Sequence, residues 1–370
     1  MQTPFRYDYV GSFLRPDRLK AARLGFEKGI VTAEELKAVE DECITELIGK
    51  LKELGYKVIT DGEFRRSWWH MDFFWGLNGI EKRSTSHGLP FVGEVTRAET
   101  AVITGKIDGH NHPFVEHYKF VKQFEDETCI AKQTIPAPVQ LMAQLRLGDY
   151  VDQNRSVYPD DAELKADIVK AYHQVINDLY EAGCRDLQLD DCTWTLYADR
   201  KFMVRSGMTE ERLKAIAEEE IALNNAVIAC KPEGMVINTH VCRGNFHSTY
   251  ASEGAYDPIA PYLFAQENVD ALYLEYDDAR SGGFEPLKYV SDNKKVVLGL
   301  ITTKRPELED KEEVIARIRD AAQYVPLERL CISTQCGFAS TEEGNKLTAG
   351  QQWDKLRLIK EIAEEVWGDC

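Results

Sequence analysis

The feature that most constrains the fold of this chain is a regular alternation of short β-type runs with longer amphipathic helical stretches. Several of the short runs end in polar or glycine-containing clusters, as strands that lead into loops commonly do. The runs predicted as strands are 7–13, 56–63, 131–138, 185–191, 235–242, 271–278, 295–303 and 330–337. Eight strands, each followed by a helical segment, predict an α/β fold of the (β/α)₈ TIM-barrel type, although a doubly wound open sheet would show the same alternation with fewer repeats.

The helical stretches between these runs carry their own start and stop signals. The clearest is 32–55, in which Thr32 is placed as the N-cap, Glu35 completes a capping box, and Gly55 ends the helix. Comparable amphipathic patterns cover 161–183, 209–230, 311–325 and 351–367. These stretches are predicted to be the helices that surround the barrel.

The segment 64–130, between the second and third predicted strands, is too long for an ordinary connection in such a barrel. It contains its own apolar alternation at 99–108. We therefore predict an inserted excursion over one end of the barrel. Because no internal repeat, low-complexity tract or linker is evident, residues 1–370 are predicted to form a single domain.

Composition excludes several classes of function. The chain has 45 Lys and Arg against 62 Asp and Glu, a net charge of −17, and a surface this acidic repels nucleic-acid backbones and anionic lipids. We therefore expect no nucleic-acid partner and no membrane partner. The N-terminus has no basic region followed by an apolar run, which favours a cytoplasmic location. Nine irregularly spaced cysteines predict reduced thiols rather than a disulfide framework.

Ligand-type side chains gather at the ends of three predicted strands. His240 and Cys242 are two residues apart, so a strand would place both on one face. Glu275 lies near the end of the next strand and Cys336 near the end of the last. Active sites of such barrels lie at the C-terminal ends of the strands. Imidazole, carboxylate and two thiolates at one mouth predict a zinc site, because soft thiolates select zinc over magnesium or calcium.

Longer motifs around these residues carry a family resemblance. They are VGSF (10–13), DGEFRRSWWH (61–70), LQLDD (187–191), CRGNF (242–246), EYDDARSG (275–282), GLITTK (299–304) and QCGFASTEEGN (335–345). The chain resembles the catalytic half of the cobalamin-independent methionine synthase family. The resemblance is closest to its short single-domain bacterial members, which are similar to 5-methyltetrahydropteroyltriglutamate–homocysteine methyltransferases, and it spans nearly the whole chain.

The resemblance implies a zinc-dependent methyltransferase of methionine biosynthesis. It implies a zinc ion held by His240, Cys242, Glu275 and Cys336, and methyl transfer to the thiolate of homocysteine. A free thiol has a pKa of ~8.5, and metal coordination removes its proton.

The resemblance also implies how the amino-acid part of the thiol is held. Gly11 and Ser12 would bind its carboxylate through backbone and hydroxyl groups, and Glu63 and Asp190 would bind its ammonium group.

The chain departs from the family pattern around the methyl donor. Lys304 stands where the longer enzymes have a proton-donating histidine, and it becomes the candidate proton donor, although its ordinary pKa of about 10.4 makes it a weaker acid. Near Gln144, those enzymes have a tryptophan that stacks on the pterin. The N-terminal half that supports the polyglutamate tail has no counterpart. The donor is therefore left open among methyltetrahydrofolate, a methylcorrinoid and a small sulfonium or thioether compound.

Two other functions are compatible with the same ligand pattern. One is alkyl transfer to a different thiol, such as coenzyme M, and the other is a metal-binding barrel with decayed catalysis. Glu63 and Asp190 favour an amino-acid thiol over coenzyme M. The sequence indicates no oligomeric state.

Two further groups of residues are interpreted as packing residues. The aromatic run 67–79 is expected to form a buried cluster under the excursion, with a wall of a substrate cleft as the alternative. Cysteines without ligand-type companions, Cys192 among them, are expected to be small buried apolar groups.

Overall fold

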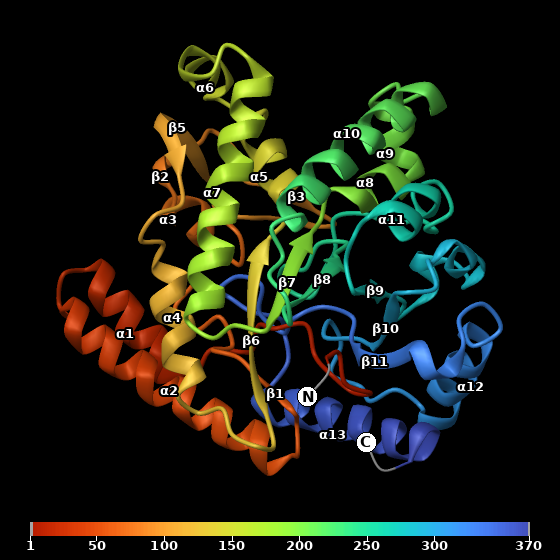
Figure 1. The fold of residues 1–370 in the computed structure, drawn as a ribbon. Coiled ribbons are helices and arrows are strands. Elements are labelled where there is room, and N and C mark those ends of the chain that lie inside the picture. The colour runs from red at the N-terminus through yellow and green to blue at the C-terminus, as the bar shows by residue number, and fades with distance from the viewer. Residues whose placement is uncertain (1–2, 369–370) are drawn as a thin grey trace.

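A curled sheet of parallel strands forms the centre of the protein (Figure 1). The computed structural model describes residues 3–368, and the remaining ends of the predicted domain, 1–2 and 369–370, lie outside the described residues. In spatial order the strands are β1 (Val58–Ile59), β6 (Ile130–Pro136), β7 (Asp186–Asp191), β8 (Val236–Val241), β9 (Ala271–Glu275), β10 (Lys295–Ile301) and β11 (Leu330–Thr334). Each strand pairs in parallel with the next, which confirms the TIM-barrel-like α/β prediction.

The first predicted strand, 7–13, is not a regular strand. An isolated parallel bridge joins Tyr7 to Ile332 of β11. On its other side a side chain makes the link to β1, because the Tyr9 hydroxyl donates to the Val58 carbonyl at 2.8 Å. The segment thus lies between the two edges of the curled sheet, but side-chain hydrogen bonds replace a backbone ladder toward β1.

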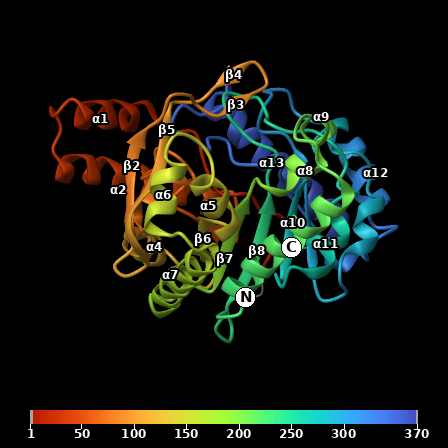
Figure 2. The ribbon, with the colours of Figure 1, turned by 90° about the horizontal axis from the view of Figure 1, so that it is seen from above.

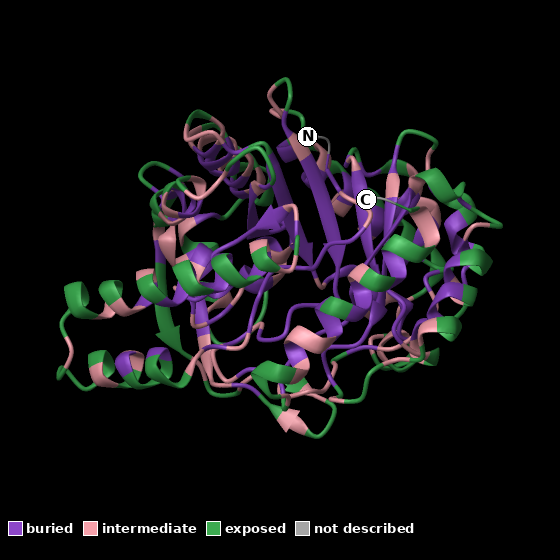
Figure 3. Cartoon of the chain, turned by 90° about the horizontal axis from the view of Figure 1, so that it is seen from below, coloured by how far each residue is buried: buried purple, intermediate pink, exposed green. Residues whose placement is uncertain are grey.

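Amphipathic helices cover the outside of the sheet, with buried strands inside and exposed outer helix faces (Figure 3). They are α1 (Asp17–Glu27), α2 (Ala33–Glu53), α5 (Pro138–Leu145), α6 (Val151–Val157), α7 (Asp161–Glu181), α8 (Trp194–Ala198), α9 (Arg200–Arg205), α10 (Glu210–Ile228), α11 (Ala260–Gln266), α12 (Lys311–Ala321) and α13 (Ala349–Trp367). The capping box of Thr32 and Glu35 at the start of α2 is confirmed. None of the helices within residues 3–368 is long and apolar enough to cross a membrane.

The prediction that a helix follows every strand is wrong between β9 and β10. Only two short 3₁₀ segments occur there, η1 (Ala279–Ser281) and η2 (Glu285–Tyr289). Gly282 and Gly283 interrupt the stretch, and Gly282 adopts a φ of 73° that a continuing helix cannot accommodate.

The segment between β1 and β6 folds into two small antiparallel pairs and two helices. They are α3 (Met71–Gly76), β2 (Asn78–Ser84) paired with β5 (Glu99–Asp108), β3 (Pro90–Phe91) paired with β4 (Glu94–Val95), and α4 (Pro113–Lys122). Figure 2 shows the β3–β4 hairpin at the edge of the molecule, near β5. The interpretation of 64–130 as an insertion stays a prediction.

Candidate metal centre and substrate cavity

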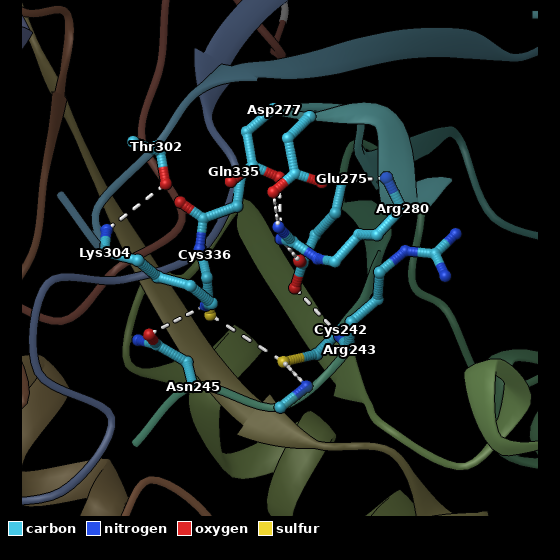
Figure 4. A network of polar contacts seen from close by, with 12 residues as sticks. Cys242, Arg243, Asn245, Glu275, Asp277, Arg280, Thr302, Lys304, Gln335 and Cys336 are labelled. Atoms are coloured by element: carbon cyan, nitrogen blue, oxygen red, sulfur yellow. Dashed lines mark hydrogen bonds and ion pairs between the residues drawn. The ribbon is translucent and has the colours of Figure 1, made fainter. Parts of the chain in front are cut away.

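Four ligand-type side chains converge at the C-terminal ends of the strands. One ligand atom from each of His240, Cys242, Glu275 and Cys336 lies within 4.8 Å of the others, and all four residues are buried. The two sulfur atoms are 3.7 Å apart (Figure 4). Residues from β8, β9 and the end of β11, distant in the sequence, therefore form one compact cluster of nitrogen, oxygen and sulfur donors.

The parallel register explains why these side chains meet. His240 lies in β8 opposite Asp190 of β7, and Cys242 follows directly after β8, so alternation places both ligands on one side. Glu275 is the last residue of β9. Cys336 comes two residues after β11. Strand ends of one parallel sheet share an edge, and that edge is where the cluster forms.

The Glu275 carboxylate is held ionised and oriented. One oxygen accepts a hydrogen bond from the Arg243 backbone N–H at 2.8 Å, and the other pairs with Arg280 at 3.1 Å. Burial alone would raise the pKa of Glu275, but the charges of Lys304 and Arg280 outweigh it and hold this pKa below its ordinary value. The carboxylate is therefore available as an anionic ligand.

The chemistry of the cluster fits a zinc ion. Neither ring nitrogen of the buried His240 has a hydrogen-bond partner among the described residues, whereas buried polar atoms are nearly always paired. Two thiols and a carboxylate at this spacing would carry up to three negative charges, which a divalent cation compensates. Two sulfurs, one imidazole and one carboxylate are zinc ligands.

A cavity of about 450 Å³ opens onto this cluster. Ser12, Glu63 and Asp190 line it together with three of the four ligand-type residues. Ser12 lies against Gly337, where an added Cβ would come within 1.8 Å of the serine hydroxyl oxygen. The close approach of these two segments requires glycine at this position.

Glu63 and Asp190 form a second charged feature of the cavity. The Glu63 side chain accepts from the Thr134 hydroxyl at 3.1 Å and pairs with Arg66 at 3.3 Å, and its other oxygen has no partner among the described residues. Burial raises the pKa of Glu63. Burial and then the nearby Glu63 raise the pKa of Asp190 well above its ordinary value. A cationic group between these carboxyls would restore their ionised forms.

The structure places the other predicted site residues as follows. Gly11 lies behind the cavity wall, where an added Cβ would be 3.0 Å from the Thr134 side chain. Lys304 is buried and does not line the cavity, and its ammonium group donates to the Asn245 side chain at 3.0 Å (Figure 4). Gln144 lines the cavity and donates to the Thr100 hydroxyl at 2.9 Å.

Much of the cavity lining was not among the predicted site residues, and Trp69, His70 and Cys192 are examples. Trp69 and His70 line the cavity, so the run 67–79 is both a packing cluster and a cavity wall. Cys192 lines it as well. The sequence could have indicated Cys192, because it directly follows β7 as Cys242 directly follows β8. The register of the two strands places these two cysteines side by side. No comparable signal marks Trp69, since its loop follows no sequence period.

Comparisons with known proteins agree with the predicted resemblance. Residues 6–364 match the family model described as the catalytic domain of cobalamin-independent synthase. The chain is 44% identical over 369 residues to the uncharacterized protein YxjG of Bacillus subtilis, covering 98% of this chain and 95% of that protein. It is 26% identical over 334 residues to a methionine synthase of Saccharolobus solfataricus, covering 89% and 86%. A solved structure from Listeria monocytogenes, proposed to be a vitamin-B12-independent methionine synthase, matches over 100% of both chains at 39% identity with a TM-score of 0.78. The chain belongs to the family of cobalamin-independent synthase catalytic domains.

Proposed function

We propose that the protein transfers a methyl group to the thiolate sulfur of homocysteine, giving methionine, with a zinc ion held by His240, Cys242, Glu275 and Cys336. The convergence of these four side chains, three of which line the cavity, supports the proposal most directly. The names of the relatives in Saccharolobus and Listeria agree with this reaction.

The chemistry divides between the metal and the protein. Zinc, when bound, lowers the pKa of the incoming thiol so that it is a thiolate at neutral pH. Glu63 and Asp190 bind the ammonium group of the amino acid, because both line the cavity and one oxygen of Glu63 has no hydrogen-bond partner among the described residues. Ser12 and the backbone next to Gly11 bind its carboxylate. The same two carboxylates disfavour an anionic thiol such as coenzyme M.

The role of Lys304 as proton donor stays a prediction. Its ammonium group is one hydrogen bond removed from the cavity, through Asn245, which is itself a wall residue. A donor whose leaving group needs a proton would have to reach this ammonium group past Asn245, because the Asn245 amide oxygen accepts the hydrogen bond and does not carry the proton further.

Metal content tests the proposed ligand set. Purified wild-type protein should contain close to one zinc per chain by elemental analysis. His240→Ala and Cys336→Ser should each lose nearly all of it, because three ligands no longer close the site. Cys230→Ser, at a half-buried cysteine distant from the cluster, is the matched control and should keep its zinc. Full zinc in both ligand variants would contradict the assignment.

Methyl transfer tests the reaction. Homocysteine should be converted to methionine by at least one donor from a panel of methyltetrahydrofolate monoglutamate, methylcobalamin and methyl sulfonium compounds. The wild-type protein is compared with Cys336→Ser in each reaction. Absence of methionine with every donor would contradict the proposed function.

A further inference from the structure

Part of the cavity wall is aromatic. Trp69, Phe91 and Phe246 line it, from the loop before α3, from the β3–β4 hairpin and from the loop after β8. The Phe91 and Phe246 rings lie 5.6 Å apart, and the hairpin is fixed by a 3.0 Å hydrogen bond from the Val92 N–H to the Tyr250 carbonyl. This part of the cavity wall is therefore a set of aromatic rings whose segments are held in place by backbone hydrogen bonds.

Among the described residues that line this cavity two are arginines, Arg243 and Arg205, and neither supplies a buried cation beside the sulfur atoms. Arg243 touches the wall, but its guanidinium lies 4.3 Å from the centre of the Tyr256 ring and donates to the Gly254 carbonyl at 2.7 Å, away from the sulfur atoms (Figure 4). Arg205 is exposed at the rim. The acidic Glu63 and Asp190 lie inside. Aromatic faces and nearby carboxylates together attract a cation that is poorly hydrated.

Neither of the two nitrogen acids considered for this cavity, Lys304 and His70, is both placed in its wall and charged. Lys304 is behind Asn245. His70 lines the wall, but burial lowers its pKa to about 3, so the imidazole is neutral at physiological pH. Loss of a methyl group from an N-methyl donor such as methyltetrahydrofolate leaves an amine nitrogen that must be protonated. A methyl sulfonium leaves as a neutral thioether and needs no proton.

We propose that the methyl donor is a small methyl sulfonium compound, bound with its cationic methyl groups against Trp69 and Phe246. This inference rests on the proposed function. In the step, the thiolate electron pair of homocysteine forms a new C–S bond. The old C–S⁺ bond breaks, and its electron pair stays on the departing sulfur. Charge and atoms balance without another reactant: thiolate plus sulfonium gives two thioethers.

The dimensions of the cavity favour a small donor. Reacting atoms must approach to roughly 3–3.5 Å, and the sulfur site lies inside a cavity of about 450 Å³ beside the hairpin. A whole corrinoid is larger than a cavity of this volume.

A labelled donor assay tests the inference. S-methylmethionine deuterated in both S-methyl groups is supplied with homocysteine carrying ¹³C in its carbon chain, and methionine that carries both labels is measured, because the departing methionine carries deuterium alone. Its rate of formation is compared with that of ¹³C-methionine from methyltetrahydrofolate monoglutamate and from methylcobalamin. We expect the sulfonium to give the highest kcat/KM by tenfold or more. Faster transfer from either of the other donors, with the sulfonium at background, would overturn the inference and leave the proposed function standing. Absence of product with every donor would defeat the proposed function itself.

Variants at the aromatic wall give a readout independent of turnover. Trp69→Leu should raise the KM for the sulfonium about tenfold, the size of a desolvated cation–π contact, with zinc content unchanged. Trp69→Phe should restore most of the affinity. Quenching of tryptophan fluorescence by trimethylsulfonium measures binding without reaction, and Phe246→Leu, which keeps Trp69 as the reporter, should weaken it. Unchanged KM and binding in both leucine variants would contradict the aromatic subsite.

Discussion

Glu63 has an unusual backbone conformation, and one of its carboxylate oxygens has no hydrogen-bond partner among the described residues. Its φ of 61° lies in the left-handed region, where a non-glycine residue costs of order 1–3 kcal/mol. The Asp61 side chain accepts from the Glu63 backbone N–H at 2.8 Å and stabilises this turn. Glu63 lines the cavity, so this strained turn stands at the proposed substrate site.

Glu63→Gln should weaken homocysteine binding and leave the fold intact. The amide cannot form a charge-assisted hydrogen bond with an ammonium group, so the KM for homocysteine should rise about 10–100-fold. The thermal midpoint should fall only by a few degrees, because burial already disfavours the ionised form, although the change removes the ion-pair partner of the buried Arg66. Glu116→Gln, at an exposed position on α4, is the control. An unchanged KM, measured by steady-state kinetics, would remove Glu63 from the proposed substrate site.

The sequence predicted the candidate cluster residues that belong to or directly follow a regular strand. His240, Cys242 and Glu275 were predictable because strand period and strand end determine where they point. Trp69 and His70 were not, since they belong to a loop whose course depends on tertiary contacts, such as the hydrogen bond from the Trp69 N–H to the Ser340 carbonyl.

At the scale of elements, α10 contacts the end of α11 through buried polar groups. Asn224 of α10 donates to the Glu267 carboxyl at 2.7 Å, and Glu267 is fully buried. Burial, followed by the nearby Asp191, raises the pKa of Glu267 to about 8, while Lys294 lowers it slightly. The carboxyl is therefore protonated in the folded protein at neutral pH.

This contact predicts a pH-dependent stability. A raised pKa in the folded state stabilises the fold fully below the ordinary pKa of about 4.3, and this stabilisation is lost as the pH rises through about 8. Between pH 6 and 9 the free energy of unfolding should therefore fall by about 2 kcal/mol more in the wild type than in Glu267→Gln. Chemical denaturation at both pH values measures the difference. An equal change in the free energy of unfolding between pH 6 and 9 in the two proteins would show that the Glu267 carboxyl is not protonated.

Element boundaries were predictable where local chemistry decides them. The start of α2 follows from Thr32 and Glu35, which interact within one turn. The absence of an α-helix between β9 and β10 was not predicted. A helix was expected there only because strands and helices alternate elsewhere, and the helix-breaking pair Gly282 and Gly283 was not considered. Segment 7–13 has strand-like residues, but its pairing depends on both edges of the sheet.

At the scale of the whole molecule, the ligand cluster joins strands from separate parts of the sheet. β8 and β9 are neighbours, and Cys336 comes from the strand beyond β10. A metal bound only by the folded protein stabilises it by mass action, about 4 kcal/mol at a free concentration 1,000 times the Kd.

Removal of the metal should therefore lower the stability of the entire fold. Treatment with a chelator should reduce the thermal midpoint by several degrees, and added zinc should restore it. Cys336→Ser should show the lower midpoint from the start and should not respond to the chelator. A midpoint that is the same with and without chelator in the wild type would indicate that no metal bridges these strands.

The N-terminal segment 7–13 has a consequence for substrate binding. This segment pairs with β11 through an isolated bridge and not through a regular ladder of backbone hydrogen bonds. It carries Gly11 and Ser12, the proposed carboxylate-binding residues. A substrate bound there would hold segment 7–13 in its place between β1 and β11. Closure of the barrel and recognition of the amino acid would then be one thermodynamic event, visible as slower amide hydrogen exchange along 7–13 when homocysteine is present.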